Sequence, residues 1–210
     1  MTYMTGESRY AASYPLPVPG SEEAVVQAAR RGDLEAFNAL VLMHQARAYN
    51  LAYRLLGDEA AAADATQEAF LRAYQHIRDF QRGAFFTWLY RIVANVCYDL
   101  LRYQKRRPAL PFTQLSGAPD HDSPDFDAPA LDADSPETII QRRELAALLQ
   151  RHIDTLPVDQ RLTLVLSDVQ GLSYQEIAEV TRSNLGTVKS RLSRARAQLR
   201  QSLGRVQWAL

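Results

Sequence analysis

The sequence contains very few of the residues that build covalent cross-links or metal centres. It has one cysteine, Cys97, and four histidines. One cysteine excludes an intrachain disulfide and a cysteine-based metal cluster, and four scattered histidines argue against metal catalysis. No apolar run approaches the ~18 residues of a membrane span, and the N-terminus lacks the pattern of a secretory signal. We therefore expect a cytoplasmic protein with no metal, cofactor, small-molecule substrate or membrane insertion.

Signatures of catalysis are also missing from the sequence. There is no strand-like alternation of apolar and polar residues, and no strand followed by a glycine-rich phosphate loop. These absences argue against a nucleotide-binding α/β fold. We find no convincing nucleophile–base pair and no metal-ligand spacing, so an α-helical enzyme has little support. The sequence predicts a protein that is not an enzyme and has no catalytic residue.

Glycine and proline divide the chain into two helical segments. They are nearly absent from residues 21–107 and 139–203, and the intervening stretch is rich in Pro, Asp and Ala. Such a stretch cannot bury enough apolar surface to offset its ordering entropy, and it is long for an ordered loop. We predict an all-α protein of two small helical domains joined by a flexible acidic linker. The predicted parts are a tail (1–20), a first domain (21–108), the linker (109–136), a second domain (137–204) and a tail (205–210).

Helical periodicity in the first domain predicts three long helices and their buried faces. Asp33 can cap the first of these and Gly57 ends it. Its inward positions are predicted to be Leu34, Phe37, Leu40, Val41, His44, Ala48, Leu51, Ala52 and Leu55. The next helix should bury Ala65, Ala69, Tyr74 and Ile77. In the third, ended by Pro108, the apolar stripe is Trp88, Ile92, Val96 and Leu100, with Leu89 left open.

The charges are balanced overall but strongly segregated. The chain has 24 Lys/Arg and 24 Asp/Glu. Residues 180–210 contain seven Lys/Arg and no acid, whereas residues 116–137 contain seven acids and no Lys/Arg. The distribution of charge, and not its sum, therefore indicates what the protein binds.

The basic end of the chain has the pattern of a helix-turn-helix. Ser173 and Glu176 form a capping-box signature for a helix start. Residues 181–184 make a short turn, after which a helix is predicted for residues 185–203. Two helices joined by so short a turn are typical of DNA-binding proteins, in which the second helix enters the major groove.

The two sides of this last helix differ in a way that suits DNA. One side carries the apolar residues Val188, Leu192, Ala195 and Leu199, and the other carries Ser190, Ser193, Arg194 and Ala197. Lys189, Arg191, Arg196 and Arg200 flank the second side. Small residues let the helix approach a groove while cations reach phosphates, so DNA would supply the missing counter-charges. A solvated basic surface is the alternative, but intrahelical Glu–Lys pairs, which would favour it, are absent.

Two stretches carry a resemblance to a known family. The stretch "LPVDQRLTLVLSDVQGLSYQEIAEVTRSNLGTVKSRLSRARAQL" resembles the promoter-binding region four of bacterial sigma-70 family sigma factors. The stretches "DATQEAFLRAYQHIRDF" and "FTWLYRIVANVCYDLLRYQKRR" resemble region two. Both occur in order, with an acidic linker between them, as in the small two-domain extracytoplasmic-function group. The resemblance covers residues 21–107 and 137–203, which is most of the chain.

The resemblance implies a promoter-specific transcription initiation factor. Its partners would be core RNA polymerase (β′ clamp helices and β flap), promoter DNA with −35 and −10 elements, and a separate anti-sigma factor. It would assist DNA melting. The family's autoinhibitory N-terminal region, region three and an added C-terminal domain have no counterpart in the sequence. The linker's acidity would either mimic nucleic acid or only aid solubility. The alternative function is a polymerase-independent helix-turn-helix repressor or activator that binds DNA as a dimer.

The resemblance also assigns residues to three sites. Those implied to bind polymerase are Asp64, Gln67, Glu68 and Phe70. Those implied for the −10 element, read as melted single strand by base stacking and phosphate contacts, are Phe85, Phe86, Arg91, Asn95, Asp99, Arg102, Lys105 and Arg106. Those implied for the −35 element are Ser183, Thr187, Lys189, Ser190, Arg191, Ser193 and Arg194. Structural roles compete with several: Phe70 and Phe85 suit a core, and Asp99 could simply pair with Arg91 or Arg102.

Overall fold

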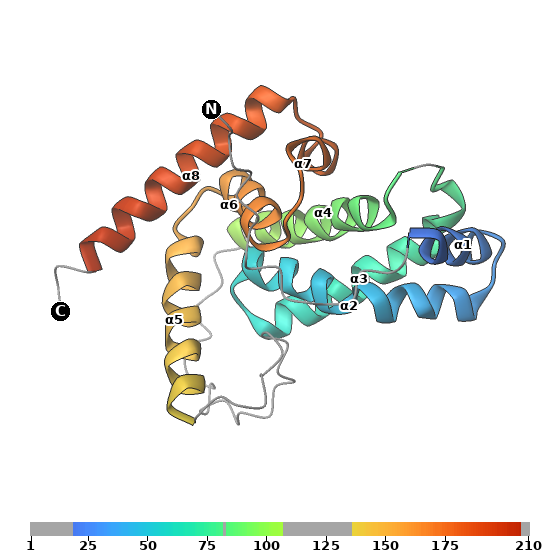
Figure 1. The fold of residues 1–210 in the computed structure, drawn as a ribbon, viewed down its shortest axis with the longest axis horizontal. Helices are drawn as coiled ribbons and strands as arrows, with labels where there is room; N and C mark the ends of the chain where they lie inside the picture. Colours follow the sequence, from blue (N-terminus) through green and yellow to red (C-terminus); the bar gives the residue numbers. More distant parts are fainter. Residues whose placement is uncertain (1–18, 82, 107–135, 207–210) are drawn as a thin grey trace, which may run out of the picture.

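The computed structural model describes residues 19–81, 83–106 and 136–206, and its regular elements there are all helical (Figure 1). The N-terminal half contains α1 (Pro19–Arg30), α2 (Leu34–Leu56), α3 (Glu59–His76), the 3₁₀ turn η1 (Ile77–Asp79) and α4 (Phe85–Arg106). The C-terminal half contains α5 (Pro136–Asp154), α6 (Val158–Leu164), the π-helical segment η2 (Val165–Val169), α7 (Tyr174–Thr181) and α8 (Leu185–Val206). The all-α prediction is confirmed. The predicted linker, apart from Pro136, lies outside the described residues.

Helix α2 begins and ends at residues with identifiable capping roles. The Asp33 carboxylate accepts a hydrogen bond from the Ala36 amide (3.1 Å) and caps α2. Gly57 ends α2 at φ +73°, and its amide donates to the Tyr53 carbonyl (2.8 Å). Glycine reaches this left-handed conformation without a Cβ penalty. Both predicted boundaries are confirmed, whereas α1 was not assigned from the sequence.

Most predicted core positions of the N-terminal half are buried. Phe37, His44 and Leu51 on α2 lie inside, as do Ala65 and Ala69 on α3. Two predictions are wrong: Leu34 is 55% exposed and Tyr74 is 45% exposed. Both residues line a groove on the surface between α2 and α3, described below, so their apolar character serves that groove and not the core.

A larger part of the surface of helix α4 is buried than the predicted apolar stripe. Val96 and Leu89 are buried as proposed, but Trp88, Ile92 and Leu100 are only partly covered. Side chains next to that stripe are also buried, namely Phe85, Tyr90, Val93, Ala94 and Cys97. The reason is that α4 packs against α2 and α3 and also contacts α7 of the C-terminal half. Burial raises the pKa of the Cys97 thiol to about 12.

The two halves share one apolar core. The larger cluster of buried residues runs from α1–α4 into the C-terminal half, where it includes Leu162, Val165, Leu166, Ile177, Val180 and Val188. A smaller cluster of Ile153, Leu156, Leu164, Leu192 and Ala195 holds α8 against α5 and α6. In Figure 1, α6 and α7 lie between α4 and α8, while α1 lies at the far end of the molecule. The two helical segments predicted from glycine and proline are therefore packed together. Their predicted bounds remain a prediction.

The π-helical segment η2 follows α6 directly and turns the chain toward two neighbours. The Gln170 amide donates to the Val165 carbonyl (2.9 Å), five residues back, which is the π pattern. Val165 and Leu166 point into the core, Asp168 reaches α8, and the Gln170 side chain reaches α4.

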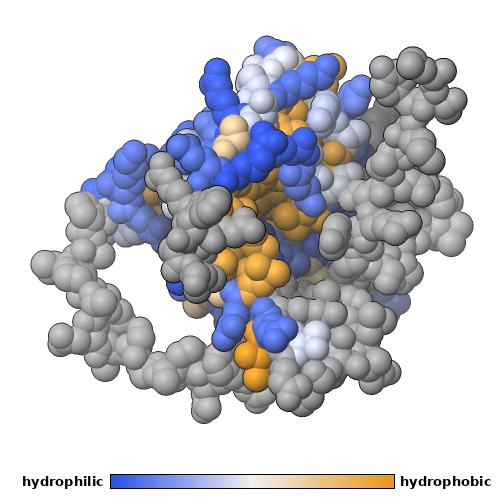
Figure 2. Space-filling view, turned by 60° about the vertical axis from the view of Figure 1, so that its left-hand side comes forward, coloured by the Kyte–Doolittle hydropathy of each residue, from blue (hydrophilic) through white to orange (hydrophobic). Residues whose placement is uncertain are grey.

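Figure 2 shows the molecule turned from the view of Figure 1, with hydrophobic side chains in a patch below a group of hydrophilic ones. Helix α5 exposes three large apolar side chains, Ile140, Leu145 and Leu149. None of the helices in the described ranges is long and apolar enough to cross a bilayer.

Candidate functional site

The helix-turn-helix is built around two local caps. The Ser173 amide donates to Glu176 Oε2 (2.7 Å) and the Glu176 amide donates to Ser173 Oγ (3.3 Å), which confirms the capping box. Arg182 ends α7 in the left-handed region, at φ +48°. The Asn184 side chain then caps α8 by accepting from the Thr187 amide (2.8 Å). These bonds fix the direction of α8 relative to α7.

The predicted faces of α8 are confirmed by its burial pattern. Val188, Leu192 and Ala195 are buried, while Ser193 and Arg194 are exposed. Of the other predicted −35 contacts, Lys189 is exposed, and those half-buried are Ser183, Thr187, Ser190 and Arg191. A helix with its apolar side packed and small polar residues outward can lie in a major groove without losing its own support.

The cations of α8 divide into paired and free ones. Arg191 Nη2 donates to Asp159 Oδ2 (2.7 Å). Arg196 forms two bonds to Asp168 (2.5 and 3.0 Å), and this carboxylate raises the pKa of the guanidinium. Among the described residues no acid pairs with Lys189, Arg194 or Arg200. The expectation that the chain offers no counter-charge is therefore wrong for Arg191 and Arg196, because their partners lie on α6 and η2, far away in sequence.

A small polar recess lies on α8. It encloses about 290 Å³ and is lined by Tyr174, Lys189, Leu192, Ser193, Arg196 and Arg200. Lys189 and Arg200 have no acidic partner among the described residues, so these two cations give the recess a positive charge of the kind that attracts phosphate.

The predicted −10 face of α4 is exposed along most of its length. Arg91 is half-buried, whereas Asn95, Asp99 and Arg102 are exposed, as are Lys105 and Arg106 at the end of the helix. Asp99 Oδ2 lies 3.7 Å from Arg72 Nη1 on α3, and Arg72 also binds Glu68 (2.7 Å). The partner of Asp99 is therefore neither Arg91 nor Arg102, and the acid of the −10 face is linked to the predicted polymerase-binding helix.

The aromatic residues around the loop before α4 are partly core and partly surface. Phe85 is 3% exposed and packs against Phe80 and Trp88, with ring centroids 6.0 and 5.6 Å away. In this conformation Phe85 is a core residue, and a base cannot stack on it. Phe86 is half-buried, so its predicted contact remains open, and it forms an edge contact with Tyr90 (6.0 Å).

Two hollows flank this loop. One, of about 410 Å³, is bounded by Glu22 and Glu23 of α1 and by Phe80, Gly83 and Phe86 of the loop side. The other, of about 280 Å³, is lined by Gly83, Trp88 and Arg91 together with Glu179 of α7. Hollows beside exposed loop backbone are the geometry that an extruded base requires. Sequence analysis did not predict that α1 or α7 would border these hollows.

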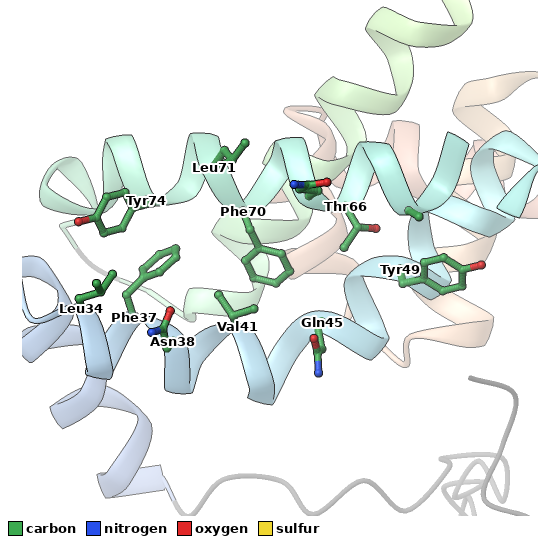
Figure 3. Close-up of a pocket in the computed structure, with 12 residues that line it drawn as sticks. Leu34, Phe37, Asn38, Val41, Gln45, Tyr49, Thr66, Phe70, Leu71 and Tyr74 are labelled. Carbon is green, nitrogen blue, oxygen red and sulfur yellow. The ribbon is translucent and has the colours of Figure 1, made fainter. Parts of the chain in front are cut away.

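Two of the four predicted polymerase-binding residues, Gln67 and Phe70, line a groove between α2 and α3 (Figure 3). The groove holds about 500 Å³, and Gln67 and Phe70 line it from α3. Figure 3 shows Phe37, Val41 and Phe70 along its floor and Tyr74 near Leu34 at one end. Asp64 and Glu68 do not line it; Asp64 is exposed and Glu68 is held by Arg72. A groove with apolar walls and polar edges suits a partner helix.

Sequence reasoning missed the α2 side of this groove. Leu34, Phe37, Asn38, Val41 and Gln45 line it, and all but Asn38 and Gln45 were assigned to the core. The signal was present: Leu34 lies at the N-terminal edge of the apolar stripe of α2, where a helix has fewest neighbours. Apolar residues at such a position are either exposed or part of a docking surface.

This geometry defines a class of protein: an α-helical DNA-binding protein with a second, apolar docking groove. Two family models match the chain, Sigma-70 region 2 at residues 40–107 and Sigma-70, region 4 at residues 146–199. Together they cover more than half of the sequence, in the family's order. The chain belongs to the sigma-70 family of sigma factors, in its extracytoplasmic-function group.

Individual relatives support the same assignment. The RNA polymerase sigma-H factor of Pseudomonas aeruginosa is 38% identical over 183 residues, which are 87% of this chain and 93% of that protein. The ECF RNA polymerase sigma factor SigE of Mycolicibacterium smegmatis is 38% identical over 82% of this chain, but the match spans only 63% of SigE. Among solved structures, CnrH in complex with the cytosolic domain of CnrY matches with a TM-score of 0.63 and 26% identity, covering 88% of this chain and 97% of CnrH.

Proposed function

We propose that this protein is a sigma factor that binds core RNA polymerase and directs transcription from specific promoters. One observation carries the proposal: regions two and four of the sigma-70 family occur in order in one chain, and each presents a surface suited to its role. No covalent chemistry is required of it. The protein contributes binding energy, and the polymerase contributes the reaction.

The groove between α2 and α3 is the proposed docking site for polymerase. Its floor carries Phe37, Val41 and Phe70, and the exposed lining residues are Leu34, Leu71 and Tyr74 together with Gln67. Exposed apolar surface of this kind is uncommon on proteins that act alone. The partner we propose is the pair of β′ clamp helices, because two helices present apolar side chains at helical spacing to such a groove. Asp64 and Glu68 would contact the polar rim of the partner.

The exposed side of α8 is the proposed contact with the −35 element. Arg194 and Lys189 have no acidic partner among the described residues, so binding DNA does not require breaking an ion pair there. Ser193 and Ser190 leave room for the helix to approach base edges. The proposed −10 contacts are the exposed Asn95, Asp99 and Arg102 of α4, together with Phe86 and Arg91 beside the loop hollows.

A protein partner that regulates the factor is also part of the proposal. CnrH, whose fold this chain shares, was solved with the cytosolic domain of CnrY bound to it. We propose that an anti-sigma factor binds this protein in a comparable way. The three exposed apolar residues of α5 and the α2–α3 groove are apolar surfaces that such a partner could cover.

Run-off transcription with purified core polymerase tests the function directly. The protein, free of inhibitor, is mixed with core enzyme and a library of random promoter sequences, and the transcripts are sequenced. We expect promoter-dependent transcripts that share two short elements. The variant compared with the parent protein is Gln67→Ala, which changes an exposed groove residue without touching the DNA-binding helices. This variant should lose transcripts and core-enzyme binding together.

Two results would contradict the proposal. One is the absence of any promoter-dependent transcript from the folded protein. The other is tight, palindromic duplex binding by the isolated protein in the absence of core enzyme, which would favour a repressor or activator that works as a dimer. A sigma factor is expected to bind duplex DNA weakly until polymerase is added.

A further inference from the structure

Helix α4 contains a single acid, Asp99, and it lies on the exposed face proposed to bind the −10 element. The cations Arg91 and Arg102 belong to the same face. An acid on a DNA-binding face repels phosphates, so it lowers affinity unless its oxygens accept a hydrogen bond from the strand. The groups of a DNA base that can donate such a bond to a carboxylate include the amino groups of cytosine, adenine and guanine. Asp99 is therefore suited to distinguishing bases and poorly suited to holding the backbone.

The carboxylate of Asp99 is held from the neighbouring helix. Its side chain is exposed, and the ion pair described for it is with Arg72 of α3, whose Nη1 lies 3.7 Å from Asp99 Oδ2. At that distance the contact is an electrostatic attraction and not a hydrogen bond. An exposed carboxylate distinguishes bases well only when its direction is fixed by surrounding groups. Arg72 is the group that supplies this direction.

Arg72 is itself anchored on α3. Its Nε donates to Glu68 Oε1 (2.7 Å), one turn earlier on the same helix. The acid precedes the cation by four residues, which is the favourable order for such a pair. Because the guanidinium is planar, a bond that fixes Nε also limits the directions in which Nη1 can project. The bond to Glu68 therefore keeps Nη1 pointing toward α4.

The two helices that carry these side chains are packed together. Ala69 and Ala73 of α3 lie in the same apolar cluster as Val93 and Val96 of α4. Arg72 is adjacent in sequence to Ala73, so it projects from a helix whose position relative to α4 is fixed by the core. Exposed ion pairs contribute little to stability. The consequence of this pair is therefore the direction of a side chain and not the free energy of unfolding.

We propose that Arg72 is a positioning residue for the −10 site: anchored by Glu68, it directs the Asp99 carboxylate toward the amino group of an unpaired base. Neither Arg72 nor Glu68 touches that base. The base selected at this position is one that bears an exocyclic amino group. Glu68 then serves two surfaces, because it is also a proposed polymerase contact. The inference rests on the proposed function, since it concerns how the same site distinguishes its DNA.

The test measures base preference in the absence of polymerase. The immobilised full chain is exposed at low salt to single-stranded DNA of about 20 nucleotides with randomised central positions, and the bound strands are sequenced. The preference at a position is the ratio of enrichment between its most and least favoured bases. The variants are Asp99→Ala, Arg72→Ala, Arg72→Lys, Glu68→Ala and the combination of Arg72→Ala with Asp99→Ala. Gln75→Ala, at an exposed position one turn further along α3, is the matched control.

We expect Asp99→Ala to abolish the preference for an amino-bearing base at one position. Arg72→Ala and Glu68→Ala should each lower this preference about threefold, a change typical of the loss of one exposed ion pair. Arg72→Ala should have no further effect when Asp99 is already replaced. Gln75→Ala should leave the preference unchanged.

Arg72→Lys separates the shape of the side chain from its charge. Lysine keeps the positive charge but lacks the planar fork that contacts two acids in fixed directions. This variant should bind the strands with the affinity of the parent and still lose most of the base preference. Circular dichroism and urea unfolding of each variant measure whether the fold is retained.

Three results would overturn the positioning role. The first is an unchanged preference in Asp99→Ala, Arg72→Ala or Glu68→Ala. The second is an equal effect of Arg72→Ala with and without Asp99. The third is an equal loss of affinity for all strands in Arg72→Ala with a salt slope lower by ~0.7, which would make Arg72 a phosphate contact. A failed run-off reaction counts against the proposed function, whereas any of these results beside normal promoter-dependent transcripts counts against Arg72 alone.

Discussion

Helices α4 and α8 are both 22 residues long, and both are proposed to bind DNA, yet they are built differently. Helix α4 is covered on two sides, by α2 and α3 and by the C-terminal half, and it buries aromatic residues such as Phe85 and Tyr90. Helix α8 is buried along one narrow line, Val188, Leu192 and Ala195. Two helices of equal length therefore leave very different shares of their surface to a partner.

The difference follows from what each helix is proposed to bind. A helix that enters the major groove must present small side chains and free cations over much of its circumference. A helix that supports a melted strand instead needs a rigid base from which a few groups project, with aromatic residues near the unpaired bases. Because α4 is buried on two sides, it is held rigidly. Because α8 is buried along one line only, most of its surface remains accessible to DNA.

The largest expected effect concerns the cores behind the two helices. Leu89→Ala on α4 and Leu192→Ala on α8 should each lower the free energy of unfolding by ~2–5 kcal/mol, because each leaves a cavity in a packed cluster. The loss should be larger for Leu89, which lies in the more extensive cluster. Urea unfolding followed by circular dichroism measures both. Leu42→Ala, at a 70% exposed position, is the control and should change stability little. A larger loss of unfolding free energy in Leu192→Ala than in Leu89→Ala would contradict this expectation.

The second effect concerns thiol reactivity. The pKa of Cys97 on α4 is raised to about 12 by burial, so at pH 8 almost none of it is thiolate, the reactive form. A cysteine introduced on α8 by Ala197→Cys lies on the exposed side and should keep an ordinary pKa. Native Cys97 should react with a thiol reagent about a thousandfold more slowly than the introduced thiol. The kinetics of the variant, with and without urea, measure this. Similar rates in the folded protein would show that α4 is not enclosed.

The third effect concerns DNA binding by the cations of α8, and it differs between those with and those without an acidic partner. Arg194 is free among the described residues, whereas Arg196 is bound to Asp168. Arg194→Ala should weaken −35 binding by ~1–3 kcal/mol if it reads a base, or reduce the salt slope by about one if it contacts a phosphate. Arg196→Ala should have a smaller effect. Anisotropy of holoenzyme with promoter DNA at several salt concentrations distinguishes the outcomes. Lys189→Ala removes a second cation that has no acidic partner among the described residues. Unchanged promoter binding in both variants would contradict the proposed role of the exposed side of α8.

The smallest effect concerns caps. Ser173→Ala and Asp33→Ala each remove a side chain that accepts from a helix N-terminal amide, and each should lower stability by ~1 kcal/mol. Only Ser173 lies in the helix pair that orients α8. Its loss should therefore also weaken −35 binding, whereas the loss of Asp33 should not. Thermal unfolding and promoter binding of the two variants give the answer. Equal effects on DNA binding would mean that the cap does not orient α8.

Local features of the chain were predictable from the sequence because their causes are local. The cap at Asp33, the end of α2 at Gly57 and the capping box of Ser173 depend on a few adjacent residues. The apolar line of α8 follows from helical periodicity alone. Predictions of this type require no knowledge of what packs against the helix.

Features that depend on distant residues were not predictable in the same way. The partners of Arg191 and Arg196 are Asp159 and Asp168, about thirty positions earlier in the chain, and charge counting along one helix cannot find them. The exposure of Tyr74 and the burial of Tyr90 depend on a groove and on the other half of the molecule. Periodicity predicts that a helix has an apolar side, but not how many neighbours it has. The polymerase-binding and −10 residues came from the family resemblance, whereas the DNA-binding side of α8 also followed from helical periodicity and charge.

The π-helical segment η2 has a consequence for how this region tolerates change. Its wider turn aims Asp168 at α8 and the residue that follows the segment, Gln170, at α4. Deleting one residue here would restore ordinary α-helical register, at no loss of helix content, yet would swing both side chains off their targets and rotate everything that follows. Substitution of the exposed Val169 would leave these contacts in place, whereas a change in length would not. Because Val165 and Leu166 are buried, this short stretch must preserve both its spacing and its apolar positions.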